Sequence, residues 1–134
     1  KKNTNSAKHD RRFDVTLLIN GLPIVQIELK QVTAKDGVFQ AFNQIKKYAE
    51  EGMFRNNIFS TLQLFVVSNE QTTRYFANAL PQFMHKKFLF SWRTKDNKKV
   101  ENLYEFCRQV LNIPDAHRLI ADYTIVSEEQ DNKV

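Results

Sequence analysis

Hydrophobic and polar residues alternate along residues 13–19 and again along residues 23–30, and an Asn-Gly pair follows the first run. Alternation with a period of two is typical of a β-strand whose two faces meet different surroundings. Asn-Gly between two such runs is a common signal for a tight turn. The pattern therefore predicts an antiparallel hairpin over residues 13–30.

The register of this hairpin depends on the length of its loop. A two-residue loop, Asn20-Gly21, would pair Ile19 with Leu22 and would mix polar and apolar residues on both faces. A three-residue loop would pair Ile19 with Pro23 and would leave one face wholly apolar. Because a shift of one residue exchanges the two faces, the clean separation favours the three-residue loop, or a bulge beside the turn.

Helical spacing begins after the hairpin. Phe42, Ile45 and Ala49 recur at intervals of three and four residues, which predicts a helix that turns these side chains toward the core. Asp36 is the predicted N-cap of this helix, and Gly52 is the predicted stop.

The rest of the chain predicts three more strands and two more helices. The strands are expected at residues 60–69, 72–78 and 86–94, and the helices at residues 101–112 and 116–126. The resulting order is β-β-α-β-β-β-α-α. It predicts an α/β fold with a mixed central sheet flanked by helices.

Composition and charge narrow the class of protein. The 134 residues are 42% hydrophobic and include eleven Phe, which is enough for one domain with a single core. No apolar run approaches the roughly 18 residues of a membrane span, and Cys107 alone cannot form a disulfide framework, so a cytoplasmic location is expected. A net charge of +5 favours polyanionic partners.

The charged residues of the hairpin are candidates for a metal-binding site. In the favoured register Asp14 lies directly opposite Glu28, and like charges opposed in this way destabilise a sheet. Lys30, which lies on the same face, would supply a counter-charge, and so would a divalent cation. Two carboxylates suit Mg²⁺, which keeps several waters when bound. The plainer alternative is a solvated face on which charges happen to sit.

This arrangement of Asp14, Glu28 and Lys30 resembles the PD-(D/E)xK nuclease motif, although Phe13 stands where the motif has its Pro. Downstream, the segment "QIKKY" resembles the QxxxY element of the RecB-like branch of that superfamily. Its glutamine and tyrosine are four residues apart, so both lie on one face of the predicted helix.

Four stretches of the chain resemble, in order, the N-terminal nuclease domain of the R subunit of type I restriction enzymes. They are "RRFDVTLLINGLPIVQIELK", "AFNQIKKY", "LQLFVVSN" and "TRYFAN", and the resemblance covers residues 11–80 most closely. It implies that residues 1–134 form one restriction-endonuclease-like domain of a larger subunit. The chain begins without Met and contains no GxxxxGK[ST] phosphate loop. An upstream acidic residue and an ATP-driven motor are therefore expected elsewhere in the parent protein.

The resemblance also implies roles for individual residues. Asp14, Glu28 and the backbone carbonyl of Leu29 would hold Mg²⁺. Lys30 would orient the attacking water and stabilise developing negative charge. Next to two carboxylates its ammonium stays protonated in the absence of metal, so an electrostatic role suits it better than that of a general base. Gln44 and Tyr48 would position the lysine, the water or a phosphate.

None of these residues reads a base, so cleavage without sequence preference is expected on double-stranded DNA. Lys46 and Lys47 flank the QxxxY helix and are expected to face solvent and contact DNA phosphates. By resemblance, the M and S subunits of a type I restriction complex handle methylation and recognition, and ATP is used by the parent's motor.

Two other functions remain open from the sequence. One is a catalytically inactive docking domain that only binds DNA or the motor, and the other is an RNA or repair nuclease of the RecB-like branch. Outside the motifs, the three histidines have no metal-ligand spacing and are expected to be ordinary surface or partly buried residues. Cys107 is expected in the core, as are the side chains of Phe88, Phe90 and Trp92.

Overall fold

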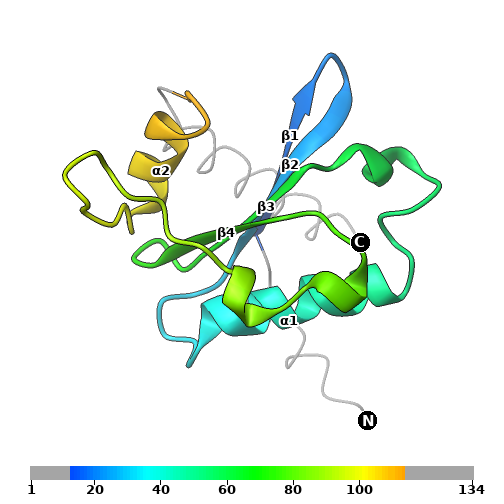
Figure 1. Ribbon diagram of the computed structural model, residues 1–134, viewed down its shortest axis with the longest axis horizontal. Coiled ribbons are helices and arrows are strands. Elements are labelled where there is room, and N and C mark those ends of the chain that lie inside the picture. Colours follow the sequence, from blue (N-terminus) through cyan, green and yellow to red (C-terminus); the bar gives the residue numbers. More distant parts are fainter. Residues whose placement is uncertain (1–12, 114–134) are drawn as a thin grey trace, which may run out of the picture.

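The computed structural model of the chain describes residues 13–113, which form one four-stranded sheet with an α-helix on each side (Figure 1). The strands are β1 (Phe13–Ile19), β2 (Leu22–Leu29), β3 (Leu64–Ser68) and β4 (Thr73–Ala77), in spatial order β1-β2-β3-β4. The helices are α1 (Gly37–Glu50) and α2 (Leu103–Gln109), with single 3-10 turns η2 (Ile58–Thr61), η3 (Pro81–Phe83) and η4 (Lys86–Phe88). The predicted α/β class and mixed sheet are confirmed.

The pairing of β1 with β2 confirms the predicted partners of the hairpin. The two strands are antiparallel, and Asp14 lies opposite Glu28 while Val15 lies opposite Ile27. Val15 and Ile27 are buried beneath α2, as expected for the apolar face.

The turn of the hairpin excludes the first predicted alternative, the three-residue loop, and confirms the second, a bulge beside the turn. It has two residues, Asn20 and Gly21, with φ of 51° and 79°, so the three-residue loop is wrong. Two left-handed residues match the right-handed twist of the flanking strands. A shift in register between Leu17 and Leu18 leaves Ile24 as the extra residue of a bulge. The hairpin therefore uses one register at its tip and the other register at its base.

The sheet is mixed because β2 pairs in parallel with β3, while β3 pairs antiparallel with β4. α1 connects β2 to β3 and covers one face of the sheet, where Phe65 packs against the rings of Phe54 and Phe76. Val66, the next residue along β3, points to the opposite face and joins the cluster under α2. The alternation of a strand thus divides the core into two halves.

α1 buries the predicted stripe of Phe42, Ile45 and Ala49 against the sheet. Asp36 occupies the N-cap position, but its side chain makes no capping hydrogen bond, so its predicted capping role is wrong. A capping side chain reaches the first turn from an extended backbone. The backbone of Asp36 is left-handed, with φ of 53°.

The C-terminus of α1 confirms Gly52 as the stop. Gly52 has φ of +79° and donates its backbone N–H to the carbonyl of Ala49, and Met53 donates to the carbonyl of Tyr48 at 3.0 Å. These two bonds form a Schellman motif, which satisfies carbonyls that the helix leaves without partners.

The predicted strand at residues 86–94 is wrong. Its first residues form η4, and beyond them only Phe90 pairs with β4, through two backbone hydrogen bonds of 2.9 Å to Tyr75. The prediction that its aromatic side chains pack in the core is also wrong, since Phe88, Phe90 and Trp92 are 43%, 47% and 38% exposed. Alternating rings imitate a half-buried strand, but no helix or strand among residues 13–113 covers them.

α2 buries Leu103, Phe106 and Cys107 against the face of the sheet that carries Val15 and Ile27. The expected core position of Cys107 is confirmed, although the helix is shorter than the predicted range of 101–112. Asn102 caps it by accepting a hydrogen bond from the backbone N–H of Glu105 at 3.1 Å. The predicted helix at residues 116–126 lies outside the described residues. Neither of the two α-helices within residues 13–113 has the length and apolar character needed to cross a membrane.

Replacing Gly52 by alanine should destabilise the domain by about 1 kcal/mol, because a Cβ disfavours the left-handed backbone. A Cβ at this position would meet no atom within 4 Å, so the loss would be conformational and not steric. Urea unfolding of Gly52→Ala and Gly52→Asn measures it, and the asparagine variant should lose less. An alanine variant as stable as the parent would contradict this account of the helix end.

Candidate active site

Two polar side chains of β2 are buried on the face that α1 covers. Gln26 pairs with Phe65 of β3 and Glu28 pairs with Val67, so all four residues share that face. Glu28 is 6% exposed and Gln26 is 9% exposed. Their burial follows from the position of β2, which has a neighbouring strand on each side.

A cleft opens where α1 stops covering the sheet. The helix packs over β3 and β4, through residues such as Phe42 and Phe76. Over β1 and β2 it leaves a hollow of about 170 Å³. The lining residues are Thr16, Gln26, Glu28, Tyr48, Met53, Phe54 and Phe59. Glu28 is the one carboxylate among them.

The hairpin register brings Asp14 to this region. Asp14 and Glu28 are direct partners in the antiparallel pairing of β1 and β2. Partners of this kind occupy the same face of a sheet, with Cβ atoms about 4.5–5.5 Å apart. The two acidic residues of the predicted motif therefore occupy neighbouring positions.

Lys30 follows the last residue of β2 and extends its pairing by one hydrogen bond, from its backbone N–H to the carbonyl of Ser68 at 2.9 Å. The first residue of α1, Gly37, lies against it. A Cβ on Gly37 would be 3.1 Å from the Cβ of Lys30 and 3.3 Å from that of Ala34. The missing side chain thus lets α1 begin beside the lysine.

Gln44 and Tyr48 form a pair on α1, as the QxxxY spacing predicts. Gln44 Nε2 donates a hydrogen bond to the Tyr48 hydroxyl. Tyr48 lines the cleft that contains Glu28, whereas Gln44 lines an adjoining hollow that Tyr48 also borders. The structure therefore connects Gln44 to the carboxylate cleft through Tyr48.

The two lysines of this helix differ in exposure. Lys47 is exposed and lines the hollow beside Gln44 and Tyr48. Lys46 is only half-buried, so the expectation that it faces solvent freely is not met. Among the two, Lys47 is the better placed to meet a phosphate.

Thr16 and Gln26 line the cleft although neither belongs to the predicted motifs. The Thr16 hydroxyl donates a hydrogen bond to Gln26 Oε1 across β1 and β2, within the same cleft as Glu28. The sequence spacing does indicate a shared face for one of them, since Gln26 lies two residues before Glu28 and side chains alternate along a strand. The pair forms a polar floor next to the carboxylate.

Other candidate residues lie away from the cleft. His85 is exposed, in agreement with its expected surface position, and His9 and His117 fall outside the described residues. Cys107 is 1% exposed in the core under α2, and burial raises the pKa of its thiol to about 11. Within residues 13–113 no group of three or more His, Cys, Asp or Glu side chains is arranged to hold a metal.

Fold and motif together define a nuclease-like α/β domain, and comparison with known proteins places it in a family. Residues 2–82 match the family described as "Type I restriction enzyme R protein N terminus". The chain belongs to this family.

Individual relatives agree with that placement. The chain is 39% identical over 126 residues to the "Type I restriction enzyme EcoprrI endonuclease subunit" of Escherichia coli, which covers 91% of this chain and 39% of the relative. It is 36% identical over 117 residues to the SauCOLORF180P endonuclease subunit of Staphylococcus aureus, covering 87% of this chain and 12% of that protein. The SsaAORF53P subunit of Staphylococcus saprophyticus is 38% identical over 117 residues, with the same coverage. The chain thus spans much less than two thirds of these relatives.

The thiol of Cys107 should resist alkylation in the folded protein. Its raised pKa keeps it protonated at about pH 8, where the thiolate is the reactive form, and its burial excludes the reagent. Mass spectrometry after treatment with iodoacetamide should show no adduct in buffer and one adduct in urea. Rapid labelling without denaturant would show that α2 opens readily.

Proposed function

We propose that this chain is the nuclease domain of a type I restriction R subunit and that it hydrolyses DNA phosphodiesters at the cleft beside β2. The observation that carries the proposal is the direct pairing of Asp14 with Glu28. Glu28 stands two residues before Lys30 and lines a cleft that Tyr48 of α1 also lines. Relatives named as endonuclease subunits support the activity.

The donor groups fit Mg²⁺ better than a metal that needs several protein ligands. The described residues contain no cluster of three acidic, histidine or cysteine side chains, but Glu28 is a buried carboxylate and Asp14 is its register partner. Mg²⁺ typically takes one or two carboxylates and keeps water in its other positions. Asp14, Glu28 and the Leu29 carbonyl would hold it. The bound ion would act as a Lewis acid toward the phosphate.

Besides the metal ion, the proposed site would have a positive charge from the protein, the ammonium group of Lys30. Lys30 is half-buried at the end of β2, and its backbone is held by the bond to Ser68 and by contact with the start of α1. A fixed ammonium at this point would stabilise negative charge on the phosphate as the attacking water adds. Holding the lysine in advance avoids reorganisation during the reaction.

Tyr48 and Gln44 act as positioning residues in this proposal. The amide of Gln44 donates to the hydroxyl of Tyr48, and Tyr48 lines the cleft. The Tyr48 hydroxyl would thereby orient a water or a phosphate oxygen near Glu28. Thr16 and Gln26 would keep the floor of the cleft polar on its other side.

The wider biological setting follows from the relatives and belongs to the same proposal. The substrate would be double-stranded DNA, cut without base preference because the cleft offers few groups that can read a base edge. Motor domains elsewhere in the parent protein would use ATP to deliver DNA. The M and S subunits of the complex would provide methylation and sequence recognition.

In the full-length parent enzyme, Asp14→Ala, Glu28→Ala and Lys30→Ala should each lower DNA cleavage by about 100-fold or more. Each substitution removes a charged side chain that would act on the metal or on the reacting phosphate. ATP hydrolysis should be retained. Plasmid cleavage and phosphate release are measured on the same preparations.

The matched control is Glu105→Ala, which removes an exposed carboxylate on α2, across the sheet from the cleft. It should leave both activities unchanged. A catalytically inactive docking domain would instead give identical cleavage for all four variants and the parent, and that result would refute the proposed function.

Lys47→Glu should weaken binding of the chain to duplex DNA. It should also reduce the slope of the logarithm of the binding constant against the logarithm of salt concentration by about one, the contribution of one phosphate contact. Lys47 is exposed beside the proposed site, and a phosphate contact carries no sequence information. Anisotropy titrations at several salt concentrations with two unrelated duplexes measure the effect. Arg55→Glu makes the same change of charge at an exposed position outside that hollow and should have the smaller effect. A strong preference for one duplex would contradict backbone-only binding.

A further inference from the structure

One segment of the described part of the chain is strongly basic. Residues 80–100 contain six Lys or Arg and one Asp, so this segment alone carries a charge of +5. The whole chain has 20 basic and 15 acidic residues and a net charge of +5. The remaining residues, with 14 of each sign, balance in sum, although residues 1–12 are also basic, with five Lys or Arg and one Asp. An anionic partner would therefore be drawn to this segment.

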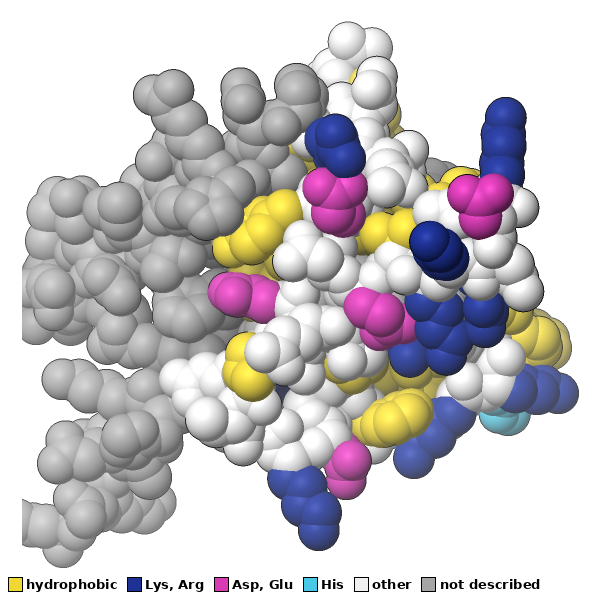
Figure 2. Space-filling view, turned by 90° about the vertical axis from the view of Figure 1, so that its left-hand side faces the viewer, with side chains coloured by type: hydrophobic (Ala, Val, Ile, Leu, Met, Phe, Trp, Pro, Cys, Tyr) yellow, Lys and Arg dark blue, Asp and Glu magenta, His cyan; other side chains and the backbone are white. Residues whose placement is uncertain are grey.

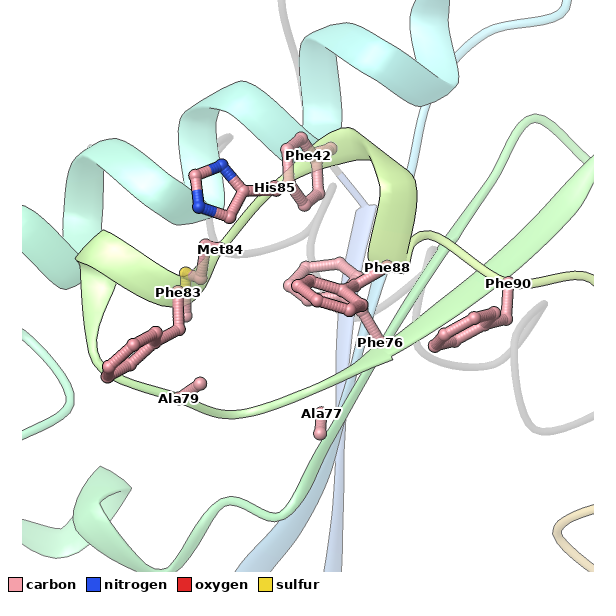
Figure 3. A pocket seen from close by; sticks show the side chains of 9 residues that line it. All are labelled: Phe42, Phe76, Ala77, Ala79, Phe83, Met84, His85, Phe88 and Phe90. Atoms are coloured by element: carbon pink, nitrogen blue, oxygen red, sulfur yellow. The ribbon is translucent and has the colours of Figure 1, made fainter.

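The same segment exposes aromatic rings. Phe83 is 59% exposed, and Phe88, Phe90 and Trp92 are exposed as well. Three of them surround a hollow of about 250 Å³ whose wall is completed by Phe42 and Phe76. Figure 3 shows Phe76 and Phe88 in the middle of this hollow, with Phe83 toward one end and Phe90 toward the other. Apolar rings open to solvent at this density are unusual on a surface that only needs to be soluble.

The rings form a continuous series. The centroid of Phe88 is 6.3 Å from that of His85 and 6.4 Å from that of Phe90. Tyr75 continues the series, 6.0 Å from Phe90 and 6.4 Å from Trp92. Successive rings thus offer several adjacent surfaces on which flat groups can stack.

Cations lie on and around these rings. Lys87 Nζ is 5.0 Å from the ring centroid of Phe88, and Lys86 Nζ is 5.3 Å from that of Phe39. All six basic side chains of the segment are exposed, and within residues 13–113 none of them forms an ion pair with a carboxylate. Figure 2, a view onto the side of the molecule that carries α2, shows Lys and Arg side chains gathered beside apolar ones.

The backbone that carries the rings is anchored at three points. Met84 is 3% exposed and inserts into the core under α1. Phe90 is held to Tyr75 by two hydrogen bonds, and Val100, which is buried, donates its N–H to the carbonyl of Trp92 at 2.8 Å. The exposed rings are therefore presented by a fixed backbone, which lowers the entropic cost of stacking a ligand on them.

We propose that residues 80–100, together with Phe39 and Tyr75, form a binding surface for single-stranded DNA. Bases of an unpaired strand would stack on the rings of Phe88, Phe90 and Trp92, while the lysines meet its phosphates. In a duplex the base faces are covered by their neighbours, so the rings select an unpaired strand. The surface shares a DNA substrate with the proposed nuclease function but none of its residues.

The position of the surface suits such a role. It borders β4, at the opposite edge of the sheet from β1, and α1 separates it from the cleft at Glu28. A helix is about 10–12 Å wide, so a strand of a few nucleotides can reach from one side to the other. An apolar protein partner would find the rings attractive but would have to bury the unpaired cations, which is costly. The charge therefore favours a nucleic acid.

Fluorescence anisotropy tests this proposal with the full 134-residue chain in EDTA, so that cleavage does not enter the result. The probes are a labelled thymidine oligonucleotide of about 12 nucleotides, an abasic oligonucleotide of the same length, and a duplex of the same length. The native chain should bind the thymidine strand at least about tenfold more tightly than the abasic strand, because stacking of one base contributes about 1–3 kcal/mol. It should also prefer the thymidine strand to the duplex.

Two sets of variants separate stacking from charge. Phe88→Leu with Phe90→Leu keeps apolar volume but removes the ring faces, and it should reduce binding of the thymidine strand about tenfold or more while leaving the abasic strand unaffected. Lys86→Ala with Lys87→Ala should weaken binding of both the thymidine strand and the abasic strand. Ile58→Ala, at a position that is 59% exposed on η2, is the matched control and should change neither. Thermal unfolding confirms that each variant is folded.

Three results would overturn the proposal. They are equal binding of the thymidine and abasic strands by the native chain, no effect of the leucine pair, and no binding of the thymidine strand at all. The last would indicate that a protein surface covers these rings. None of these results bears on the nuclease proposal, which is tested by cleavage in the Asp14, Glu28 and Lys30 variants.

Discussion

The structure depends on the pairing of β2 with a strand on each side. Its antiparallel contact with β1 brings Asp14 opposite Glu28, and its parallel contact with β3 places it inside the sheet. One face of β2 is buried under α2, and Glu28 on the other face lies beside Tyr48 of α1. A carboxylate in such a strand is held by the backbone hydrogen bonds of three strands, so it does not need its own side-chain packing to stay in place. The bond from Lys30 to Ser68 extends this support to the lysine. The rigidity that the proposed phosphodiesterase site would require therefore comes from the sheet itself.

α1 joins the core to the candidate site. Its inner side supports the aromatic cluster of Phe42, Phe65 and Phe76, and this packing sets the position of the helix over β3 and β4. Tyr48, on the same helix, is thereby carried to the edge of the cleft. Glycine matters at both ends of α1, because Gly37 allows close approach to Lys30 and Gly52 ends the helix. Core packing and site geometry are thus set by the same element.

Two surfaces with different chemistry lie on either side of α1. The cleft at Glu28 is small and partly polar, and Lys47 lies in the hollow next to it. The surface of residues 80–100 is aromatic and basic, and its charge equals that of the whole chain. Phosphate chemistry needs fixed acidic and basic groups at one point, whereas strand binding needs repeated stacking and cationic positions along a path. In the two proposals, these different requirements are assigned to different parts of the chain.

The sequence by itself determined the features that depend on neighbouring residues or on a strongly marked pattern. Alternation identified the hairpin and the pairing of Asp14 with Glu28, and helical spacing identified the buried stripe of α1 and the pair of Gln44 and Tyr48. Only the tertiary structure decided the features that depend on residues far away in the sequence. The bulge at Ile24 reconciles a two-residue turn with the register demanded by burial, and residues 86–94 form no strand because β4 meets them only at Phe90. Local periodicity records which side of a segment is apolar, but it cannot record whether another layer will cover that side.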